Sequence, residues 1–386
     1  MEYGEVKRIV FLTGTRADYG KLKALMRAVE QHEDYELQVF VTGMHMLSKY
    51  GSTYQEVVKD GFRQIYQFVN TRDNQSMDVT LSSTIIGFSN YVEEFQPDLI
   101  VVHGDRVEAL AGAIVGAFNN VRVAHIEGGE ISGTIDESIR HAITKFAHFH
   151  LVANEQAARH IVQLGESPKT IFEIGSPDID VMRADNLPSI DRAKKRYDII
   201  FEDYHIVMFH PVTTEVNTIQ VQVDELVAAI KRSSDNFIII YPNNDEGSQQ
   251  IFEAYEALQR CTNVKMFPSI RFEYFLTLLK HAISIIGNSS AGIREAGVYA
   301  TPAIDIGNRQ KGRYKVTDFS HIEHVEAKEE QIIQALECAK KKQLQETSLF
   351  GEGDSVQRFM DLLNYGEIWT VSIQKQFIPL GSGQIV

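Results

Sequence analysis

The sequence predicts an α/β fold with two doubly wound domains. Short apolar runs alternate with longer amphipathic segments along most of the chain, which is typical of parallel strands joined by crossover helices. The alternation stops at residues 183–204, which are charged and weakly patterned, and then resumes. A chain of 386 residues, 44% of them hydrophobic, can fill two cores. We therefore expect a first domain over residues 1–182 and a second over residues 205–350.

In the first half, apolar runs predict strands, and apolar residues at helical spacing predict the helices between them. The segment 18–32, for example, carries Leu22, Leu25 and Met26 on one helical face. Segment 108–119 is apolar and rich in small residues, as expected of a buried crossover helix. We expect strands at 7–12, 36–41, 98–102, 121–126, 150–153 and 170–174, and helices at 18–32, 108–119, 134–147 and 155–164.

The second half repeats the pattern, and an unusual tail follows it. We expect strands at 206–209, 237–241, 264–266, 282–287 and 303–306, and helices at 223–232, 248–260, 271–281 and 291–299. Residues 353–364 indicate one more amphipathic helix, with Phe359 and Leu363 on its apolar side. The last segment, 365–386, contains Trp369 in a partly alternating apolar run, so we expect it to pack against the protein in an unknown role.

Composition and charge exclude several classes of protein. A net charge of −14 argues against a general nucleic-acid or anionic-membrane surface, because phosphate contacts require clustered lysine and arginine. Cys261 and Cys338 form no C-x-x-C pair, which disfavours a disulfide framework or a zinc ribbon. The start of the chain lacks the layout of a signal peptide, and no apolar run approaches the ~20 residues of a membrane span. We expect a soluble, cytoplasmic protein without nucleic-acid or membrane partners.

The most informative pattern places two carboxylates at the ends of neighbouring strands. Asp105 follows the apolar run 98–102, and Glu127 follows the run 121–126. A strand, a helix and a second strand over this span form a right-handed βαβ unit with parallel strands. Open α/β sheets bind ligands at the carboxyl ends of their strands. The pattern therefore predicts an active site that contains Asp105 and Glu127.

The turn between the first strand and the first helix is a candidate anion site. Gly14 permits a tight turn, and the start of the following helix presents backbone N–H groups that suit an anion. Arg16 in this turn could hold a phosphate, or it could be an ordinary surface arginine. The chain has no G-x-G-x-x-G or Walker pattern, which disfavours a nicotinamide cofactor and an ATP-hydrolysing P-loop.

A second candidate phosphate site follows the expected strand at 282–287. There Ser289 and Ser290 precede an expected helix, so hydroxyls and backbone N–H groups would meet at its positive end. Glu295, in the first turns of that helix, could accept hydrogen bonds from a ribose or could complement the helix dipole. His210 and Asn243 end two other strands of this half, which favours a nucleotide site at these strand ends.

The helix that follows Glu127 offers a further acid. The spacing of Thr134 and Glu137 matches a capping box, which is a sufficient role for Glu137. Asp136 has no such structural role and lies four residues before Arg140 on the same helical face.

Two other chemistries receive little support. A metal could be bound by His103, Asp105 and His125, but no established ligand spacing supports a metal site. A Ser-His-Asp hydrolase is disfavoured because no G-x-S-x-G motif occurs.

The motifs, taken together, resemble one enzyme family. They are GTRADYGKL, HGDR, HIEGGEISGTIDESIRHAITKFAH, HPVTTE, GNSSAGIREAG and GNRQKGR, and the resemblance that they carry extends over about residues 7–363. This set closely resembles the hydrolysing UDP-N-acetylglucosamine 2-epimerases of sialic-acid biosynthesis. The resemblance implies two Rossmann-like doubly wound domains facing a cleft, a GT-B-like fold, with the helix near 353–364 crossing back to the first domain.

The resemblance also implies roles for individual residues. The positions that match the catalytic carboxylates of the family are Asp105, Glu127 and Asp136. The positions that match its UDP-contacting residues are Arg16, His210, Asn243, Ser289, Ser290, Glu295, Arg309 and Arg313. A UDP-sugar substrate, no cofactor, no metal and a homo-oligomer, either a dimer or a tetramer, are expected.

The implied reaction suits these residue types. Removal of the weakly acidic hydrogen at C2 needs a positioned carboxylate base, while UDP leaves from C1 by anti elimination. Water then adds to the resulting 2-acetamidoglucal with inversion at C2, giving N-acetylmannosamine. Three alternatives stay open at this point: a related epimerase acting on UDP-2,4-diacetamido-2,4,6-trideoxyglucose, a GT-B glycosyltransferase, and a non-catalytic nucleotide-sugar sensor.

Overall fold

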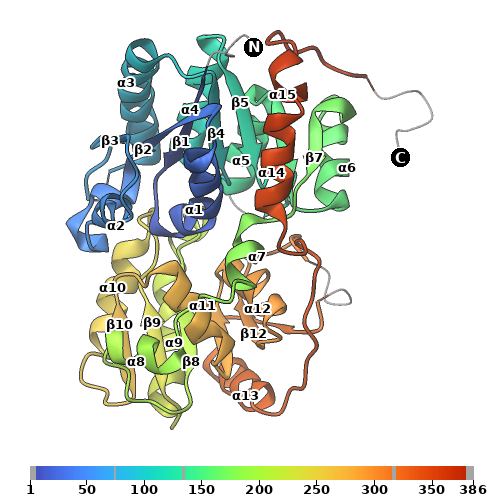
Figure 1. Cartoon of the computed structure of the whole chain (residues 1–386). Coiled ribbons are helices and arrows are strands. Elements are labelled where there is room, and N and C mark those ends of the chain that lie inside the picture. The colour runs from blue at the N-terminus through green and yellow to red at the C-terminus, as the bar shows by residue number, and fades with distance from the viewer. Residues whose placement is uncertain (1–5, 74, 133–134, 315–318, 380–386) are drawn as a thin grey trace. The chain divides into compact units, whose positions relative to one another are not determined.

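The chain forms two compact units in the computed structural model, which describes residues 6–73, 75–132, 135–314 and 319–379. Unit 1 comprises Met1–Glu130, Asp136–Arg183 and Leu349–Val386, and unit 2 comprises Ile131–Ile135 and Ala184–Ser348. Each unit is built on a parallel sheet with helices on both faces (Figure 1). This is the architecture of a Rossmann-like doubly wound domain, as the sequence predicts.

The sheet of unit 1 has seven strands in the order β3-β2-β1-β4-β5-β6-β7, and all its pairings are parallel. The strands are β1 (Lys7–Thr13), β2 (Tyr35–Val41), β3 (Ile65–Gln67), β4 (Leu99–His103), β5 (Arg122–Ile126), β6 (Phe149–Val152) and β7 (Ile171–Glu173). The direction of winding reverses between β1 and β4. Ligands of open α/β sheets bind beyond the carboxyl ends of the strands at such a switch point.

The strands of unit 1 are apolar on both faces because helices cover both. In β1, Ile9 and Phe11 face one helical layer, while Val10 and Leu12 face the other. The first layer contains α1 (Arg16–Gln31), α2 (Tyr54–Lys59), α14 (Ser355–Asn364) and α15 (Glu367–Thr370). The second contains α3 (Met77–Phe95), α4 (Val107–Phe118) and α5 (Ile135–Phe146). Two shorter helices, α6 (Glu155–Gln163) and α7 (Pro177–Met182), complete the unit.

Unit 2 repeats the same topology with six strands in the order β10-β9-β8-β11-β12-β13. Its strands are β8 (His205–Met208), β9 (Phe237–Ile240), β10 (Val264–Phe267), β11 (Ser284–Gly287), β12 (Ala303–Ile306) and β13 (Ile322–Val325). Its helices are α8 (Ile190–Arg196), α9 (Ile219–Arg232), α10 (Ser248–Glu256), α11 (Phe272–Lys280), α12 (Glu295–Val298) and α13 (Glu329–Ala339). The switch point lies between β8 and β11.

The expected strands and long helices are present with small shifts at their ends, but several elements have no counterpart in the expectation. The segment 54–95 contains α2, β3 and α3, and the charged segment 183–204 contains α8. These elements are short or only partly buried, so their apolar periodicity is weak. None of the helices in the described part of the chain has both the length and the hydropathy needed to cross a bilayer.

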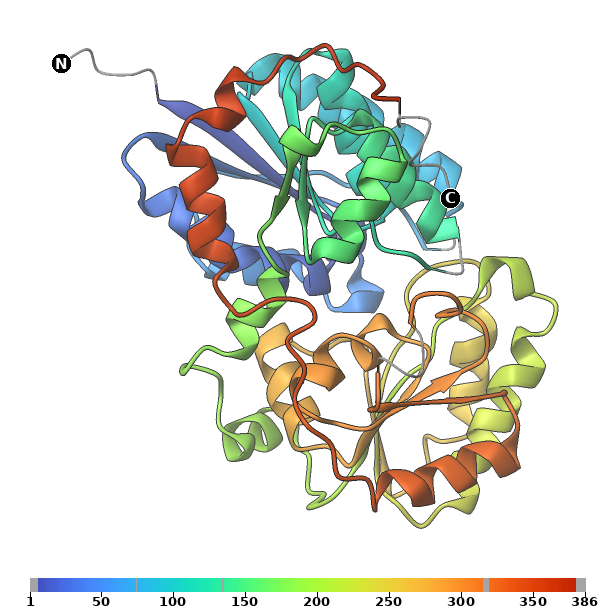
Figure 2. The same cartoon turned by 90° about the vertical axis from the view of Figure 1, so that its right-hand side faces the viewer.

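The described C-terminal residues, 355–379, pack on unit 1 (Figure 2). Phe359 and Leu363 of α14 enter the core beside α1, and Ile368 of α15 is buried with them. The Trp369 indole donates to the Leu363 carbonyl oxygen at 3.0 Å, and Arg122 donates to the Trp369 carbonyl oxygen at 2.7 Å. The tail therefore belongs to the hydrogen-bonded structure of unit 1.

Lys375 fixes the far end of this tail to the last turn of α5. Its ammonium donates to the carbonyl oxygens of Thr144, Lys145 and Ala147 at 3.0, 2.9 and 2.5 Å. It also pairs with the buried Glu166 at 2.7 Å. A cation near the last carbonyls of a helix satisfies acceptors that lack partners within the helix and suits the helix dipole.

We predict that Lys375→Met destabilises unit 1 by about 2 kcal/mol, because several charge-assisted hydrogen bonds are lost together. Urea unfolding followed by the fluorescence of Trp369, the only tryptophan, measures this. Lys59→Met, at an exposed position of α2, is the matched control and should change stability by less than about 0.5 kcal/mol. Equal urea midpoints for Lys375→Met and Lys59→Met would contradict the role of Lys375 in capping α5.

Candidate active site

Asp105 lies at the switch point of unit 1, two residues after the end of β4. Arg140 of α5 donates to the Asp105 carboxylate and, at 3.0 Å, to the carbonyl oxygen of Glu130. The guanidinium is fully buried, whereas the Asp105 side chain is one-quarter exposed. The charge-assisted contact with this buried arginine holds the Asp105 carboxylate in one position.

Arg140 interacts electrostatically with all three of the carboxylates expected from the sequence. Burial opposes its charge, but Asp105, Glu130, Asp136 and Glu127 outweigh burial and raise the pKa of Arg140 above its ordinary value. Asp105 is thus paired with Arg140, and Glu127 and Asp136 act on the same cation electrostatically.

Glu127 has a strained backbone and a buried carboxylate. Its φ of +63° lies in the left-handed region, which is uncommon for residues other than glycine and occurs often at functional sites. The Ser176 hydroxyl donates to one carboxylate oxygen, and His103 Nε2 lies 3.2 Å from the other. Lys21 Nζ is 3.9 Å from the first oxygen and 3.0 Å from Asp178.

Two N–H groups of the turn after β1, where the sequence predicts an anion site, are occupied by a side chain of the protein itself. The Asp18 carboxylate accepts from the N–H groups of Gly14 and Thr15 at 3.0 and 2.9 Å, and Thr15 in turn caps α1. The reason is a capping box, Thr15-x-x-Asp18, which occupies these donors internally. Arg16 remains in the turn and pairs with Glu56 of α2 at 2.6 Å.

His125 supports the Asp105 turn instead of holding a metal. Its Nε2 donates to the Gly104 carbonyl oxygen at 2.7 Å, and its Nδ1 lies 3.3 Å from the Thr144 hydroxyl. Burial lowers its pKa to about 3, so it is neutral. Its neighbours His103 and Asp105 have other partners, and no group of three metal-ligating side chains is found across the described residues.

In unit 2, the amide of Asn288 joins the two strand ends at the switch point. Its oxygen accepts from the N–H of His210 at 2.7 Å, and its nitrogen donates to the carbonyl oxygen of His210 at 2.8 Å. Gly287 precedes it at φ +129°, where a Cβ would lie 2.1 Å from the Met208 carbonyl oxygen. A glycine is therefore required for β11 to end this close to β8.

The other expected nucleotide-site residues of unit 2 join this same cluster. His210 Nδ1 accepts from the N–H of Asn243 at 3.1 Å, so the end of β9 is attached to it. Arg309 donates to the Asn288 carbonyl oxygen at 3.2 Å. Arg313 donates at 3.3 Å to Gln310, which itself donates to Asn288. Unit 2 thus presents an amide, an imidazole and two guanidinium groups around one switch point.

The helix expected at 291–299 is a 3₁₀ turn (Ser290–Gly292) followed by the four-residue α12. The Ser289 hydroxyl caps the turn by accepting from the N–H of Ala291 at 3.3 Å. Glycines at 292 and 297 lower the helix propensity of this segment, and the 3₁₀ turn ends at the first of them. The expected helix dipole is therefore weak, and Glu295, at the start of α12, is buried.

The analysis of motifs missed several residues at both switch points. Asn288 lies within the quoted motifs and ends an apolar run, which could have identified it. Lys21 is a charged residue on the buried side of α1, beside its apolar stripe. For Ser176 and Asp178 no sequence signal exists, because α7 brings them to the site from a distant part of the chain.

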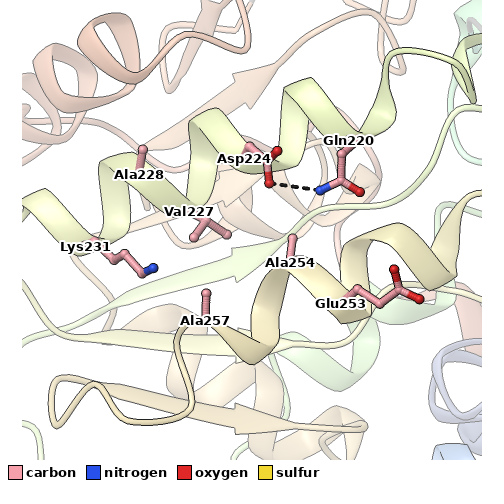
Figure 3. A pocket seen from close by; sticks show the side chains of 8 residues that line it. All are labelled: Gln220, Asp224, Val227, Ala228, Lys231, Glu253, Ala254 and Ala257. Atoms are coloured by element: carbon pink, nitrogen blue, oxygen red, sulfur yellow. Dashed lines mark hydrogen bonds between the residues drawn. The ribbon is translucent and has the colours of Figure 1, made fainter.

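A surface hollow elsewhere in unit 2 contains none of these residues. It lies between α9 and α10, where Gln220 donates to Asp224 at 2.9 Å above a floor of small apolar side chains (Figure 3). The hollow has no convergent polar groups of the kind that fix a ligand.

Two Rossmann-like units, one with clustered carboxylates and one with a polar, cationic switch point, define a GT-B-like protein. The chain belongs to the UDP-N-acetylglucosamine 2-epimerase family, whose model matches residues 27–364. It is 47% identical over 380 residues to the UDP-N-acetylglucosamine 2-epimerase of Neisseria meningitidis, covering 97% of this chain and 100% of that protein.

Two further proteins show the range of the similarity. A UDP-N,N'-diacetylbacillosamine 2-epimerase (hydrolyzing) of Legionella pneumophila is 31% identical, covering 93% of this chain and 96% of that protein. The crystal structure of Methanocaldococcus jannaschii UDP-GlcNAc 2-epimerase with UDP-GlcNAc and UDP shares the fold, with a TM-score of 0.78 and 19% identity. The superposition covers 93% of this chain and 100% of that structure.

The buried histidines predict that unit 1 loses stability in mild acid. Burial lowers the pKa of His148 to about 4 and that of His125 to about 3, both below the ordinary 6.5. The unfolded chain therefore binds more protons than the native state below pH 6.5, so stability falls as the pH drops from 7 to 5.

The contribution of His148 to this pH dependence of stability can be measured separately. His148 Nδ1 accepts from the N–H of Val123, and its Nε2 donates to the Ile373 carbonyl oxygen. Glutamine can make both hydrogen bonds without titrating, so His148→Gln should lose less stability between pH 7 and pH 5 than the wild type. Urea midpoints at both pH values measure this. If His148→Gln loses as much stability between pH 7 and pH 5 as the wild type does, His148 does not contribute to the pH dependence of stability.

Proposed function

We propose that the protein is a hydrolysing UDP-N-acetylglucosamine 2-epimerase, which converts UDP-N-acetylglucosamine and water into N-acetylmannosamine and UDP. The observation that carries the proposal is that Asp105 and Glu127 follow the adjacent parallel strands β4 and β5, with Asp105 paired to the buried Arg140 and Asp136 on the same helix as that arginine. A reaction that removes and then adds a proton at one carbon needs more than one acid–base group.

The proposed reaction has two steps. A carboxylate removes the C2 proton while UDP leaves from C1, which gives 2-acetamidoglucal. Water then supplies hydroxyl to C1, and a proton adds to C2 on the opposite face, so the configuration at C2 is inverted. We assign Asp105 and Glu127 as the acid–base pair and Asp136 as a supporting or alternate acid.

The nucleotide half of the substrate is assigned to the switch point of unit 2. His210, Asn243, Ser289 and Ser290 would contact UDP, and Arg309 and Arg313 would supply positive charge to the diphosphate. Glu295 would accept from the ribose, and Arg16 of unit 1 would add a further cation. Support comes from the cluster around Asn288, which fixes His210, Asn243 and Arg309 in one place.

A second substrate is favoured by a specific relative. The Legionella pneumophila protein is named for UDP-N,N'-diacetylbacillosamine, which carries a second acetamido group. The choice between the two substrates depends on contacts to the sugar at C4 and C6. The relative from Neisseria meningitidis, at higher identity, supports UDP-N-acetylglucosamine as the substrate. The place that we propose, the first step of sialic-acid biosynthesis, rests on the resemblance of the sequence motifs. A homo-oligomer stays a prediction, and sedimentation would test it.

The direct test is incubation with UDP-N-acetylglucosamine in D₂O without an acceptor. A hydrolysing epimerase releases UDP and N-acetylmannosamine with deuterium at C2. Release of UDP-N-acetylmannosamine would show an epimerase that does not hydrolyse, and no turnover would favour a binding protein. Parallel incubation with UDP-2,4-diacetamido-2,4,6-trideoxyglucose identifies the preferred sugar.

We predict that Asp105→Asn and Glu127→Gln each lower turnover by about 10²-fold or more and leave UDP affinity nearly unchanged. Both substitutions keep the shape of the side chain but remove its capacity to exchange a proton. Glu93→Gln, at an exposed position of α3, is the control. Near-normal turnover in both site variants would exclude the assignment.

We predict that Ser290→Ala weakens UDP binding by about tenfold, the loss expected for one hydrogen bond, while Arg16→Ala weakens binding and also lowers turnover. Isothermal titration with UDP and steady-state kinetics separate the two effects. Unchanged UDP affinity in Ser290→Ala would place the diphosphate elsewhere.

A further inference from the structure

A compact group of four ionisable side chains surrounds one end of the unit 1 switch point. His103 comes from the end of β4, Glu127 from the turn after β5, Lys21 from α1 and Asp178 from α7. Their side chains are at most 9% exposed, and that of Asp178 is completely buried. The expected site includes Glu127 but not Lys21 or Asp178, and His103 enters the expectation only as a possible ligand of the disfavoured metal site.

The formal charges of this group do not balance without an additional proton. Lys21 supplies one positive charge, whereas Glu127 and Asp178 supply two negative charges. A buried net charge is unfavourable, and one proton on His103 or on Glu127 would neutralise the group. His103 Nε2 is 3.2 Å from Glu127 Oε2 but is not aligned for a hydrogen bond, so a small rotation of either side chain precedes transfer of the proton between them. Lys21 is nearer Asp178, at 3.0 Å, than Glu127, at 3.9 Å.

The surrounding charged groups increase the need for the proton. Arg140 is positive, but it interacts with three carboxylates besides Glu127: Asp105, Glu130 and Asp136. His125, the nearest further titratable group on β5, is neutral because it is buried. Ser176 donates to the same oxygen of Glu127 that faces Lys21, and the other oxygen faces His103.

We propose that Lys21, His103, Glu127 and Asp178 act as one buried unit that holds a single exchangeable proton between His103 and Glu127. This inference deepens the proposed function and rests on it for the chemical step. The shared proton is the one that adds to C2 of the 2-acetamidoglucal while water adds its hydroxyl to C1. The second proton of that water passes to another carboxylate and then to solvent, and solvent returns a proton to the unit. His103 and Asp178 are positioning residues for Glu127.

The charges on either side of the shared proton predict opposite responses to two isosteric substitutions. Asp178→Asn removes a negative charge and makes the proton easier to lose. Lys21→Met removes a positive charge and makes the proton harder to lose. We expect the titration midpoint of the His103 imidazole, followed by NMR with ¹⁵N-labelled histidine, to move down in the first variant and up in the second, each by about one pH unit.

The titration has built-in controls. The resonance of His103 is identified by its absence in His103→Gln, and the resonance of the partly buried His32, which is 3.8 Å from Asp34, should not move in either variant. Lys21→Arg keeps the charge and should leave the midpoint of His103 in place. If Asp178→Asn does not fold, Lys21→Met and Lys21→Arg still decide the outcome.

The role of the shared proton in the reaction is tested separately, by measuring turnover and products. His103→Gln should lower turnover by about 10²-fold and release 2-acetamidoglucal with UDP, because elimination precedes use of the shared proton. His32→Gln should leave both turnover and product unchanged. If the titration midpoint of His103 stays fixed, or moves in the same direction in Asp178→Asn and Lys21→Met, the buried unit is excluded. If His103→Gln is slow but releases no 2-acetamidoglucal, the role of the unit in hydration is excluded. If the wild type acts on neither sugar, the proposed function fails, while the NMR titration still tests the unit.

Discussion

The ion pair between Arg140 and Asp105 is the interaction on which the carboxylate site of unit 1 depends. A fully buried guanidinium is tolerated only when acids surround it, and Arg140 has Asp105 and a backbone carbonyl oxygen as direct partners. The pair ties α5 to the turn after β4, and His125 supports the same turn from β5. The ends of two strands and a helix are thereby fixed relative to one another.

At the switch point of unit 2, a neutral amide instead of an ion pair holds the strand ends together. The Asn288 amide makes two hydrogen bonds across the gap between the ends of β8 and β11, so no charge is buried to close it. The cations Arg309 and Arg313 lie around this amide with partly buried side chains. The same topology therefore supports a carboxylate cluster in one unit and a cationic cluster in the other, and the strand-end residues decide which forms.

The C-terminal segment connects the stability of unit 1 to its site. Lys375 holds the last turn of α5, and the first turn of the same helix carries Asp136. Thr144, whose carbonyl oxygen accepts from Lys375, also lies beside His125 under the Asp105 turn. A segment without a recognisable motif thus contributes to the position of the helix that bears the site.

The sequence by itself determined the two α/β domains, most strands and long helices, and the grouping of Asp105 with Glu127. These features follow from local periodicity and from the rule that parallel strands end at one edge, both of which can be evaluated along the chain. The motifs also determined the family. Local sequence patterns did not predict how short α12 is. The helix expected at 291–299, which contains two glycines, is a 3₁₀ turn followed by one short helix.

Only the tertiary structure decided which charges meet. The partners of Arg140, the occupation of the β1 turn by Asp18 and the group formed by Lys21, His103, Glu127 and Asp178 depend on elements that are distant in sequence. Asp178 illustrates the reason: it reaches the site because α7 packs on α1, and nothing in its own segment records that contact. Ionic interactions act through space over a few ångströms, so packing and not the order of residues determines them.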